Sequence, residues 1–373
     1  RLNWLKFALM SGKEEIKEIE LQLSKFIYEL ENEDRLVRVG LKENSESSKI
    51  YKKFSKLFTK ETIKLLSEEI KKTKDSKQKD ILERIQFTLI GSFIGLQLAA
   101  EADKLTTYFS KATVTVDGEK IAYFELMPRI SKDPIFDKRE KYDSASTAVV
   151  SKITPKELAL LNSEIKLLRS LGFSGYLDAY SKGKKMDYAK FHRIVKKTIG
   201  QTDRLWNTVM TKFSPELLGK PFKNIKSAHL AYLRSMSMYD NYYPKDKIVL
   251  VFLKWAKDIG LSDLLSSIKI DDADRPKKNP RAVCYWPNPP TEIHLVIKPI
   301  GGEQDFEAMF HEGGHSLHFA GVDASLPYSF RQLSYTNAMT EGYAFVLEDL
   351  IFDPEFLTSY LNVSSYTGNK IKW

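Results

Sequence analysis

Apolar residues recur with a helical period through the first hundred positions of the chain. In residues 13–31 the apolar stripe consists of Ile16, Ile19, Leu23, Phe26 and Ile27, and charged residues occupy the other positions. Residues 53–72 and 79–105 repeat the pattern, the second with a wide apolar face. Because no sequence repeat accompanies it, the pattern predicts a helical bundle and not a solenoid.

The period then changes to that of a strand. Residues 113–125 alternate around Asp117-Gly118, which predicts a β-hairpin with a two-residue turn. We expect residues 131–146 to be a polar connection, with helices resuming from about Pro155 to Ala256.

The next segment mixes loop, strand and helix signals. Residues 271–290 carry five of the 14 prolines, so we expect a largely extended loop. After it, a short strand is predicted from inward Ile293, Leu295 and Ile297 alternating with outward Glu292, His294 and Lys298. A helix should begin just after Gly301-Gly302, with Asp305 near its start.

Length and composition set the broad class. A chain of 373 residues exceeds the roughly 250–300 at which single cores stop growing, so two regions are expected: 1–199 and 200–373. The net charge of +9 comes from 58 basic and 49 acidic residues spread along the chain, which favours a solvated lysine-rich surface over a nucleic-acid partner. The longest apolar stretch is about 14 residues, short of the ~20 that a spanning helix needs, and the single cysteine, Cys284, forms no internal disulfide. We therefore expect a cytoplasmic protein with no membrane partner.

Candidate chemistry lies in residues 310–319, "FHEGGHSLHF", which hold three of the six histidines. His311 and His315 are four apart, so on a helix both imidazoles project from one face and can meet one tetrahedral ion at ~2.0–2.1 Å. Glu312 would then lie beside the metal, placed to act as a general base. The alternative is a stretch of core rich in imidazole, since matches to so short a motif also occur by chance. Phe306, Met309 and Phe310 supply the packing face of the helix that the motif needs.

The third metal ligand is less clearly marked. His318 would lie about 10 Å along the helix axis from His311, too far to share the ion, and is either near the substrate or a buried structural histidine. Glu341 begins an amphipathic helix 26 residues after His315 and is the better candidate, because a metal would compensate an inward carboxylate. An acidic residue favoured by the helix dipole is its ordinary alternative. Glu348 and Asp349 are weaker candidates.

These residues resemble the gluzincin oligopeptidases, namely oligoendopeptidase F and thimet oligopeptidase. "DFEAMFHEGGHSLH" is similar to their His-Glu-x-Gly-His-x-x-His helix, and "MTEGYAFVLE" to their glutamate helix. "LRSLGFSGYLDAY" and "VTVDGEKIAY" resemble further stretches of the oligoendopeptidase F branch. The resemblance implies a mainly α, zincin-like helical metallopeptidase with a small β-sheet beside the active-site helix.

The resemblance also implies the function. It predicts a zinc endopeptidase for short peptides, with one zinc ion held by His311, His315 and Glu341 and with Glu312 as the base. Residues 200–373 would form the catalytic region, and the strand Ile293–Ile297 would border the cleft and accept a peptide as an added strand. Two alternatives remain: a related metallocarboxypeptidase or dipeptidase, and a non-catalytic helical binding protein with a vestigial zinc site. The sequence does not indicate an oligomeric state.

The sequence departs from the family at three points. Glu341 is followed by Gly-Tyr-Ala, where relatives usually have other small or branched residues. Gly313 replaces a bulkier residue. The family's later helical segment, whose His and Tyr residues grip substrate and stabilise the oxyanion, has no counterpart before Trp373. We therefore expect the native polypeptide to continue, and Phe345, Leu350 and Phe352 to be partly uncovered in this chain.

Overall fold

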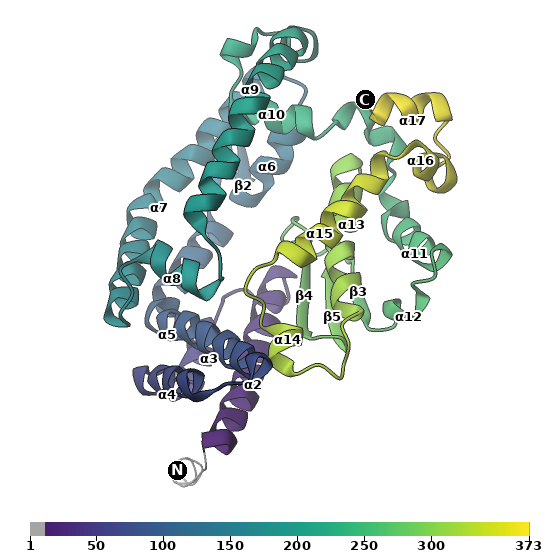
Figure 1. Ribbon diagram of the computed structural model, residues 1–373. Coiled ribbons are helices and arrows are strands. Elements are labelled where there is room, and N and C mark those ends of the chain that lie inside the picture. Colours follow the sequence, from purple (N-terminus) through teal and green to yellow (C-terminus); the bar gives the residue numbers. More distant parts are fainter. Residues whose placement is uncertain (1–11, 373) are drawn as a thin grey trace.

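A computed structural model describes residues 12–372, and it is mainly helical with a small sheet, as the sequence predicts (Figure 1). Two large hydrophobic cores organise it. One is formed by the first helices, around Phe26, Leu66 and Leu89, and the other surrounds the helix that carries the histidines, around Phe252, Phe306 and Phe310.

The first core belongs to the predicted bundle. Its helices are α2 (Gly12–Arg38), α3 (Ser47–Lys53), α4 (Lys60–Lys72) and α5 (Ser76–Lys111). Thr59 and Asp75 begin α4 and α5 by accepting hydrogen bonds from backbone N–H groups of the first turn. Within residues 12–372, α5 is the one helix long and apolar enough to cross a membrane, with a mean hydropathy of 1.3 over 18 residues. This apolar stretch is longer than the 14 or so residues expected from the sequence. In the fold it packs against α3, α4 and α7.

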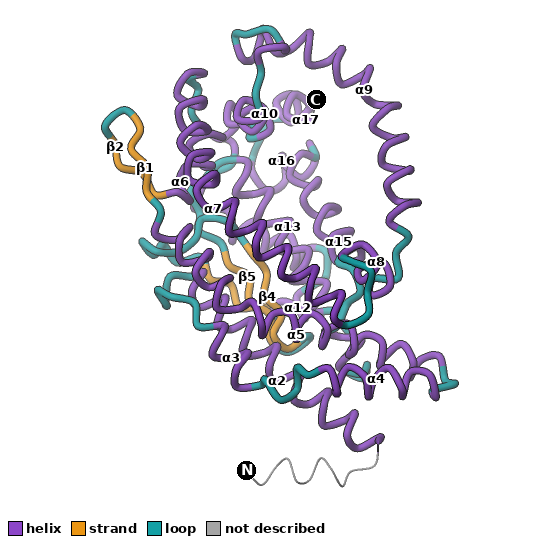
Figure 2. The backbone as a smooth tube through the Cα atoms, turned by 90° about the vertical axis from the view of Figure 1, so that its left-hand side faces the viewer, coloured by secondary structure: helices purple, strands orange, loops and turns teal. Residues whose placement is uncertain are grey.

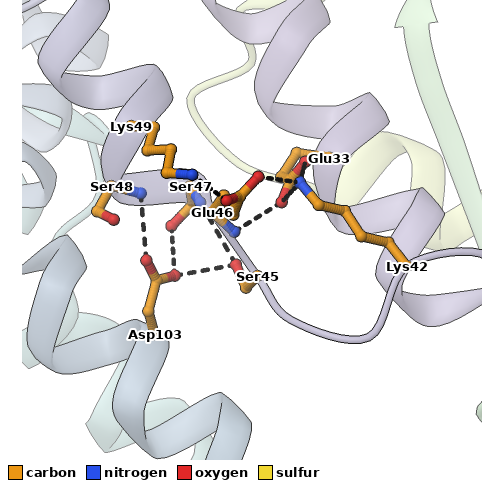
Figure 3. A network of polar contacts seen from close by, with 8 residues as sticks. All are labelled: Glu33, Lys42, Ser45, Glu46, Ser47, Ser48, Lys49 and Asp103. Atoms are coloured by element: carbon orange, nitrogen blue, oxygen red, sulfur yellow. Dashed lines mark hydrogen bonds and ion pairs between the residues drawn. The ribbon is translucent and has the colours of Figure 1, made fainter.

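The connection between α2 and α3 is held by a polar network (Figure 3). The Asp103 carboxylate of α5 accepts hydrogen bonds from the Ser45 hydroxyl (2.9 Å), the Ser47 hydroxyl (2.7 Å) and the Ser48 N–H (3.2 Å). Lys42 bridges the carboxylates of Glu33 and Glu46 at 2.7 and 2.8 Å. These contacts fix the C-terminal end of α2 against α3 and α5.

The predicted hairpin is confirmed. Strands β1 (Thr113–Val116) and β2 (Glu119–Ala122) pair in antiparallel, and the turn residues Asp117 and Gly118 both have positive φ, at 49° and 83°. Two central residues with positive φ define a type I′ turn, whose twist matches that of the strands it joins.

The middle of the chain is more helical than predicted. It forms α6 (Tyr123–Lys132), α7 (Phe136–Ser170), α8 (Tyr176–Gly183) and α9 (Tyr188–Leu218). The expected polar connection over 131–146 and a helix start near Pro155 are wrong, because α7 begins at Phe136 and Pro155 lies inside it. Its buried residues Arg139, Tyr142, Val149 and Ile153 fall at helical spacing. Charged residues between them make the apolar pattern of the helix hard to recognise in the sequence. The proposed division near residue 200 falls within α9 and stays a prediction.

The second core surrounds the sheet and the helix that carries the histidines. Its helices are α11 (Ile248–Asp258), α12 (Ser262–Leu265), α13 (Glu303–Ala320), α15 (Ala338–Glu348), α16 (Pro354–Leu361) and α17 (Ser365–Lys372). Helix α10 (Ser227–Arg234) packs instead with α6 and α7 in a smaller cluster, and α14 (Tyr328–Gln332) packs against α2 and α5 of the first core. Short 3₁₀ turns η1 (Phe222–Asn224), η2 (Ser237–Tyr242), η3 (Lys245–Lys247) and η4 (Asp349–Phe352) join some of them.

The sheet has three strands in the order β3-β5-β4. Strand β5 (Glu292–Val296) lies in the middle, parallel to β3 (Ile268–Asp271) and antiparallel to β4 (Val283–Asn288). The predicted strand is confirmed, but the expectation of loop over 271–290 is wrong, since β4 lies within it.

The expected outward position of His294 is also wrong, because both faces of β5 are covered. Ile293 and Leu295 belong to the core around α13, whereas Val296 packs against Val39 at the end of α2. His294 is 8% exposed and its Nε2 lies 2.9 Å from Glu292 Oε1. A central strand buried on both faces cannot show the alternation of a half-exposed one.

Candidate metal centre

The two helices that carry the candidate ligands touch through their backbones. A Cβ added to Gly314 of α13 would lie 2.6 Å from the Ala344 Cα and 2.8 Å from the Tyr343 carbonyl oxygen of α15. A Cβ on Gly313 would lie 2.3 Å from the Phe252 ring. Both glycines of the motif are therefore explained by packing, Gly314 against a second helix.

This packing brings His311, His315 and Glu341 together. Within residues 12–372 they are the one group of three or more histidine, cysteine or carboxylate side chains whose ligand atoms all lie within 4.8 Å of one another. Glu341 Oε2 lies 3.6 Å from His311 Nε2 and 3.7 Å from His315 Nε2. Ligands at 2.0–2.1 Å from one tetrahedral ion are about 3.3 Å apart, so small side-chain movements would close the site around a metal.

The other ring nitrogens of both histidines are already engaged. His311 Nδ1 lies 2.6 Å from Glu348 Oε2, and His315 Nδ1 lies 2.7 Å from the Thr340 hydroxyl oxygen. These contacts aim both Nε2 atoms at Glu341. Metal-binding histidines in proteins almost always have such a partner on the second nitrogen. The residues present therefore fit a metal ion with two imidazoles and one carboxylate.

Burial favours the neutral form of His315, which is the form that binds a metal. His315 is 7% exposed, and its burial lowers the pKa of the imidazole, an effect that the nearby Glu341 opposes. Glu341 is the most accessible member, with a side chain 40% exposed, so the open side of the group lies toward this residue.

Glu312, the predicted base, follows His311 on α13 and is tied to the sheet. Its Oε2 accepts a hydrogen bond of 2.7 Å from the Cys284 N–H of strand β4. Burial raises the pKa of this carboxyl, and the Cys284 N–H and the charges of His311, Arg281 and Arg38 oppose the increase. A carboxylate that is tethered but easier to protonate than usual suits proton transfer.

The remaining candidates take other places. His318 does not join the metal group: its ring stacks on Tyr343 at 4.9 Å, and its buried Nδ1 has no hydrogen-bond partner among residues 12–372. Glu348, considered as a weaker ligand, instead holds His311. Asp349 is exposed at the start of η4.

The predicted strand packs against α13, but the prediction that a peptide adds to it is wrong. Strand β5 is paired on both edges, so it cannot accept a peptide as an added strand. Strand β4 lies at the edge of the sheet and reaches Glu312 through Cys284. Its next outward N–H, that of Trp286, donates to Glu31 of α2 at 3.2 Å. The prolines around β4 concealed it in the sequence, because proline is typical of loops and of edge strands alike.

The three apolar residues expected to be partly uncovered are so, to different degrees. Phe345 is 54% exposed, while Leu350 and Phe352 are half-buried and pack against the second core.

Comparison with known proteins supports the fold. No protein-family model and no curated protein sequence matches the chain. Among solved structures, the chain resembles one described as "a putative oligoendopeptidase F from Bacillus anthracis str. Ames", with a TM-score of 0.56 and 12% sequence identity. The similarity covers 91% of this chain and 63% of that one, so the chain spans less than two thirds of its neighbour. The chain thus has an oligoendopeptidase-like fold, with a group of two histidines and a glutamate that could hold a metal.

Proposed function

We propose that this protein is a zinc-dependent peptidase that hydrolyses short peptides, with His311, His315 and Glu341 as the metal ligands and Glu312 as the general base. The observation that carries the proposal is the arrangement of the two imidazoles. Each is held through Nδ1, and each presents Nε2 to the same carboxylate oxygen. The oligoendopeptidase-like fold of the chain supports the same assignment.

The chemistry divides between the metal and the chain. A bound zinc ion supplies a Lewis acid for the scissile carbonyl and makes water acidic enough to act as a nucleophile near neutral pH. Glu312 Oε2, held by the Cys284 N–H, takes the proton of the attacking water and returns it to the leaving amine.

The test separates metal binding from chemistry. Metal analysis of the purified protein should find about one zinc per chain, and a quenched fluorescent peptide should be cleaved. Glu312→Gln keeps the size of the side chain but cannot accept the proton, so zinc should remain while turnover falls by at least about 10²-fold. His311→Ala should lose both. Near-normal turnover by Glu312→Gln would contradict the mechanism.

A non-catalytic protein with a vestigial site remains the competing function. It predicts zinc binding by the wild-type chain without measurable peptide cleavage. A metal other than zinc is a separate outcome, because two histidines and a carboxylate also suit non-haem iron. Metal analysis distinguishes these two metals directly.

A further inference from the structure

Part of the segment that joins α13 to α15, residues 321–337, belongs to the first core. Leu333 is buried among the apolar side chains of that core, and α14 packs against α2 and α5 (Figure 1). The Gln332 side-chain amide of α14 also donates to Glu31 of α2 at 3.0 Å. Because α13 carries the two candidate histidines and α15 the candidate glutamate, the two halves of the metal group are joined through the bundle.

Arg84 of α5 holds the C-terminal part of this segment. Its Nη1 donates to the Leu333 carbonyl oxygen at 2.6 Å, and its Nε donates at 2.8 Å to the carboxylate of Asp80, one turn earlier on α5. The guanidinium also lies over two aromatic rings of the segment, 4.8 Å from the centre of Phe330 and 4.4 Å from that of Tyr335. Hydrogen bonds and cation–π contacts from one planar group therefore restrain both the backbone and the side chains of the segment.

Tyr335 is held by two further contacts. Its hydroxyl donates to Asp80 Oδ1 at 2.9 Å, and Lys185, between α8 and α9, lies over its ring at 4.3 Å. Lys185 also pairs with Asp80 at 2.6 Å. Burial raises the pKa of Asp80, but hydrogen bonds from Lys185, Arg84 and Tyr335 outweigh it and bring the pKa to about 2. The carboxylate is therefore ionised at neutral pH. We call Asp80, Arg84, Lys185 and Tyr335 the Arg84 clamp.

The first turn of α15 depends on what precedes it. Helix α15 begins at Ala338, three residues after Tyr335, and its N-cap residue Asn337 makes no side-chain capping hydrogen bond. Thr340 and Glu341 lie in this turn. The contact of α15 with α13 through Gly314 comes later in the helix, at Tyr343 and Ala344. The clamp is thus the nearest anchor on the N-terminal side of the candidate ligand.

We propose that Arg84 is a positioning residue for the candidate metal centre. By holding the segment before α15 on the bundle, it keeps Thr340 and Glu341 in place against the two histidines. The inference rests on the proposed function and adds the bundle to the parts that determine metal affinity. Release of this segment from the bundle would weaken the metal centre, and by linkage a bound metal would strengthen the attachment by the same factor.

The first test measures zinc affinity by competition with a chromophoric chelator. Arg84→Gln should raise the Kd for zinc about 3- to 30-fold, because the first turn of α15 is then in place for a smaller fraction of the time. Arg84→Lys keeps the charge and one donor and should raise the Kd less. Loss of a positive charge by itself would favour a cation, so a weaker affinity in Arg84→Gln is not an effect of net charge. An unchanged Kd would overturn the proposal.

The matched control is Asp103→Ala in the same bundle. The Asp103 carboxylate accepts three hydrogen bonds, all from the connection between α2 and α3 and none from residues 330–335. The variant should lower the midpoint of thermal unfolding, as Arg84→Gln does, and leave the Kd for zinc as it is in the wild type. If both variants weakened zinc binding equally, the cause would be the stability of the bundle and the positioning role of Arg84 would be rejected.

The second test needs no metal. Hydrogen exchange of the metal-free protein reports the opening of α15, whose Glu341 N–H donates to the Asn337 carbonyl oxygen at 2.8 Å. In Arg84→Gln the amides of the first turn of α15 should exchange faster by at least the factor found for the Kd. Exchange follows the ratio of open to closed forms directly, whereas the Kd responds only once the open fraction is substantial. Exchange at the wild-type rate would overturn the proposal, even if zinc affinity fell.

The two tests also separate the inference from the function on which it rests. A wild-type protein that binds no zinc would reject the proposed function, and the exchange of α15 would still decide whether Arg84 holds its first turn. A wild-type protein that binds zinc and cleaves peptide, together with an Arg84→Gln variant that matches it in both tests, would retain the function and reject the role of Arg84.

Discussion

At the scale of single residues, Thr340 and Glu348 act on the metal group without belonging to it. Each contacts the Nδ1 of one histidine and thereby orients that ring. We expect Thr340→Val and Glu348→Gln each to weaken zinc binding about 10- to 100-fold, because the ring orientation and the basicity of Nε2 both depend on this partner. Competition with a chromophoric chelator measures the affinity.

Asp349→Asn is the matched control for Glu348→Gln. It removes the same charge from the next position, where the side chain is exposed and makes no contact with His311. If both substitutions weakened zinc binding equally, the effect would be one of net charge and the orienting role of Glu348 would be rejected.

Glu31 should make the stability of the fold depend on pH. Burial raises its pKa from 4.5 to about 7, Asp34 adds to the shift, and hydrogen bonds from Trp286 and Gln332 oppose it. The folded state therefore binds this proton more tightly than the unfolded state. The stabilisation is complete below pH 4.5 and is lost as the pH rises through 7, a change of about 3 kcal/mol in the free energy of unfolding.

Urea unfolding between pH 4.5 and 8 measures that change. Glu31→Gln should flatten the dependence, since the amide carries no proton to lose. Glu29→Gln, two residues earlier and paired with Lys53 on the surface, should leave the slope as it is in the wild type. An unchanged slope in Glu31→Gln would mean that the pH dependence has another source.

At the scale of elements, the contact between α13 and α15 assembles the site. Any side chain at Gly314 meets the α15 backbone, which cannot move aside without carrying Glu341 with it. Gly314→Ala should therefore destabilise the protein by about 1–3 kcal/mol and lower its zinc affinity. Thermal unfolding with and without zinc measures both effects.

Gly342 of α15 provides the opposite case. A Cβ there has no atom within 4 Å. Gly342→Ala should stabilise the helix by up to about 1 kcal/mol, because alanine is the better helix former, and leave zinc binding intact. If Gly342→Ala behaved like Gly314→Ala, the close approach of the two helices would not be the cause.

Elements were predictable where their pattern was complete. The helix that carries the histidines was predicted because Phe306, Met309 and Phe310 mark its buried face. The hairpin was predicted because Asp117-Gly118 suits a type I′ turn. Strand β4 was not predicted, because Pro287 lies within it, Pro289-Pro290 directly follow it, and an edge strand need not show the usual alternation. The candidate metal ligands were predicted from spacing, but the partners of the two rings, Thr340 and Glu348, depend on contacts between distant segments, which no local pattern encodes.

At the scale of the whole molecule, α9 is the least integrated helix. Figure 2 shows it running along the outside of the molecule. Of its 31 residues only Met210, Ser214 and Leu218 are buried. The exposed large apolar side chains are Phe191, Ile194, Ile199, Leu205, Trp206, Val209, Phe213 and Leu217, at 37–65% exposure. An exposed apolar surface of this extent favours association between copies of the protein.

We therefore expect residues 1–373, expressed alone, to self-associate through α9 as their concentration rises. Sedimentation velocity at increasing protein concentration measures the change in mass. Leu205→Glu with Phe213→Glu should reduce association, because both residues lie on the exposed part of α9 and charging them removes the gain from burying them. The matched control is Thr198→Glu with Thr208→Glu. Both threonines are exposed on α9 and already polar, so this variant adds the same charge without removing apolar surface. Association that persists in the first variant, or disappears equally in the second, would show that the apolar side chains of α9 are not what joins the copies.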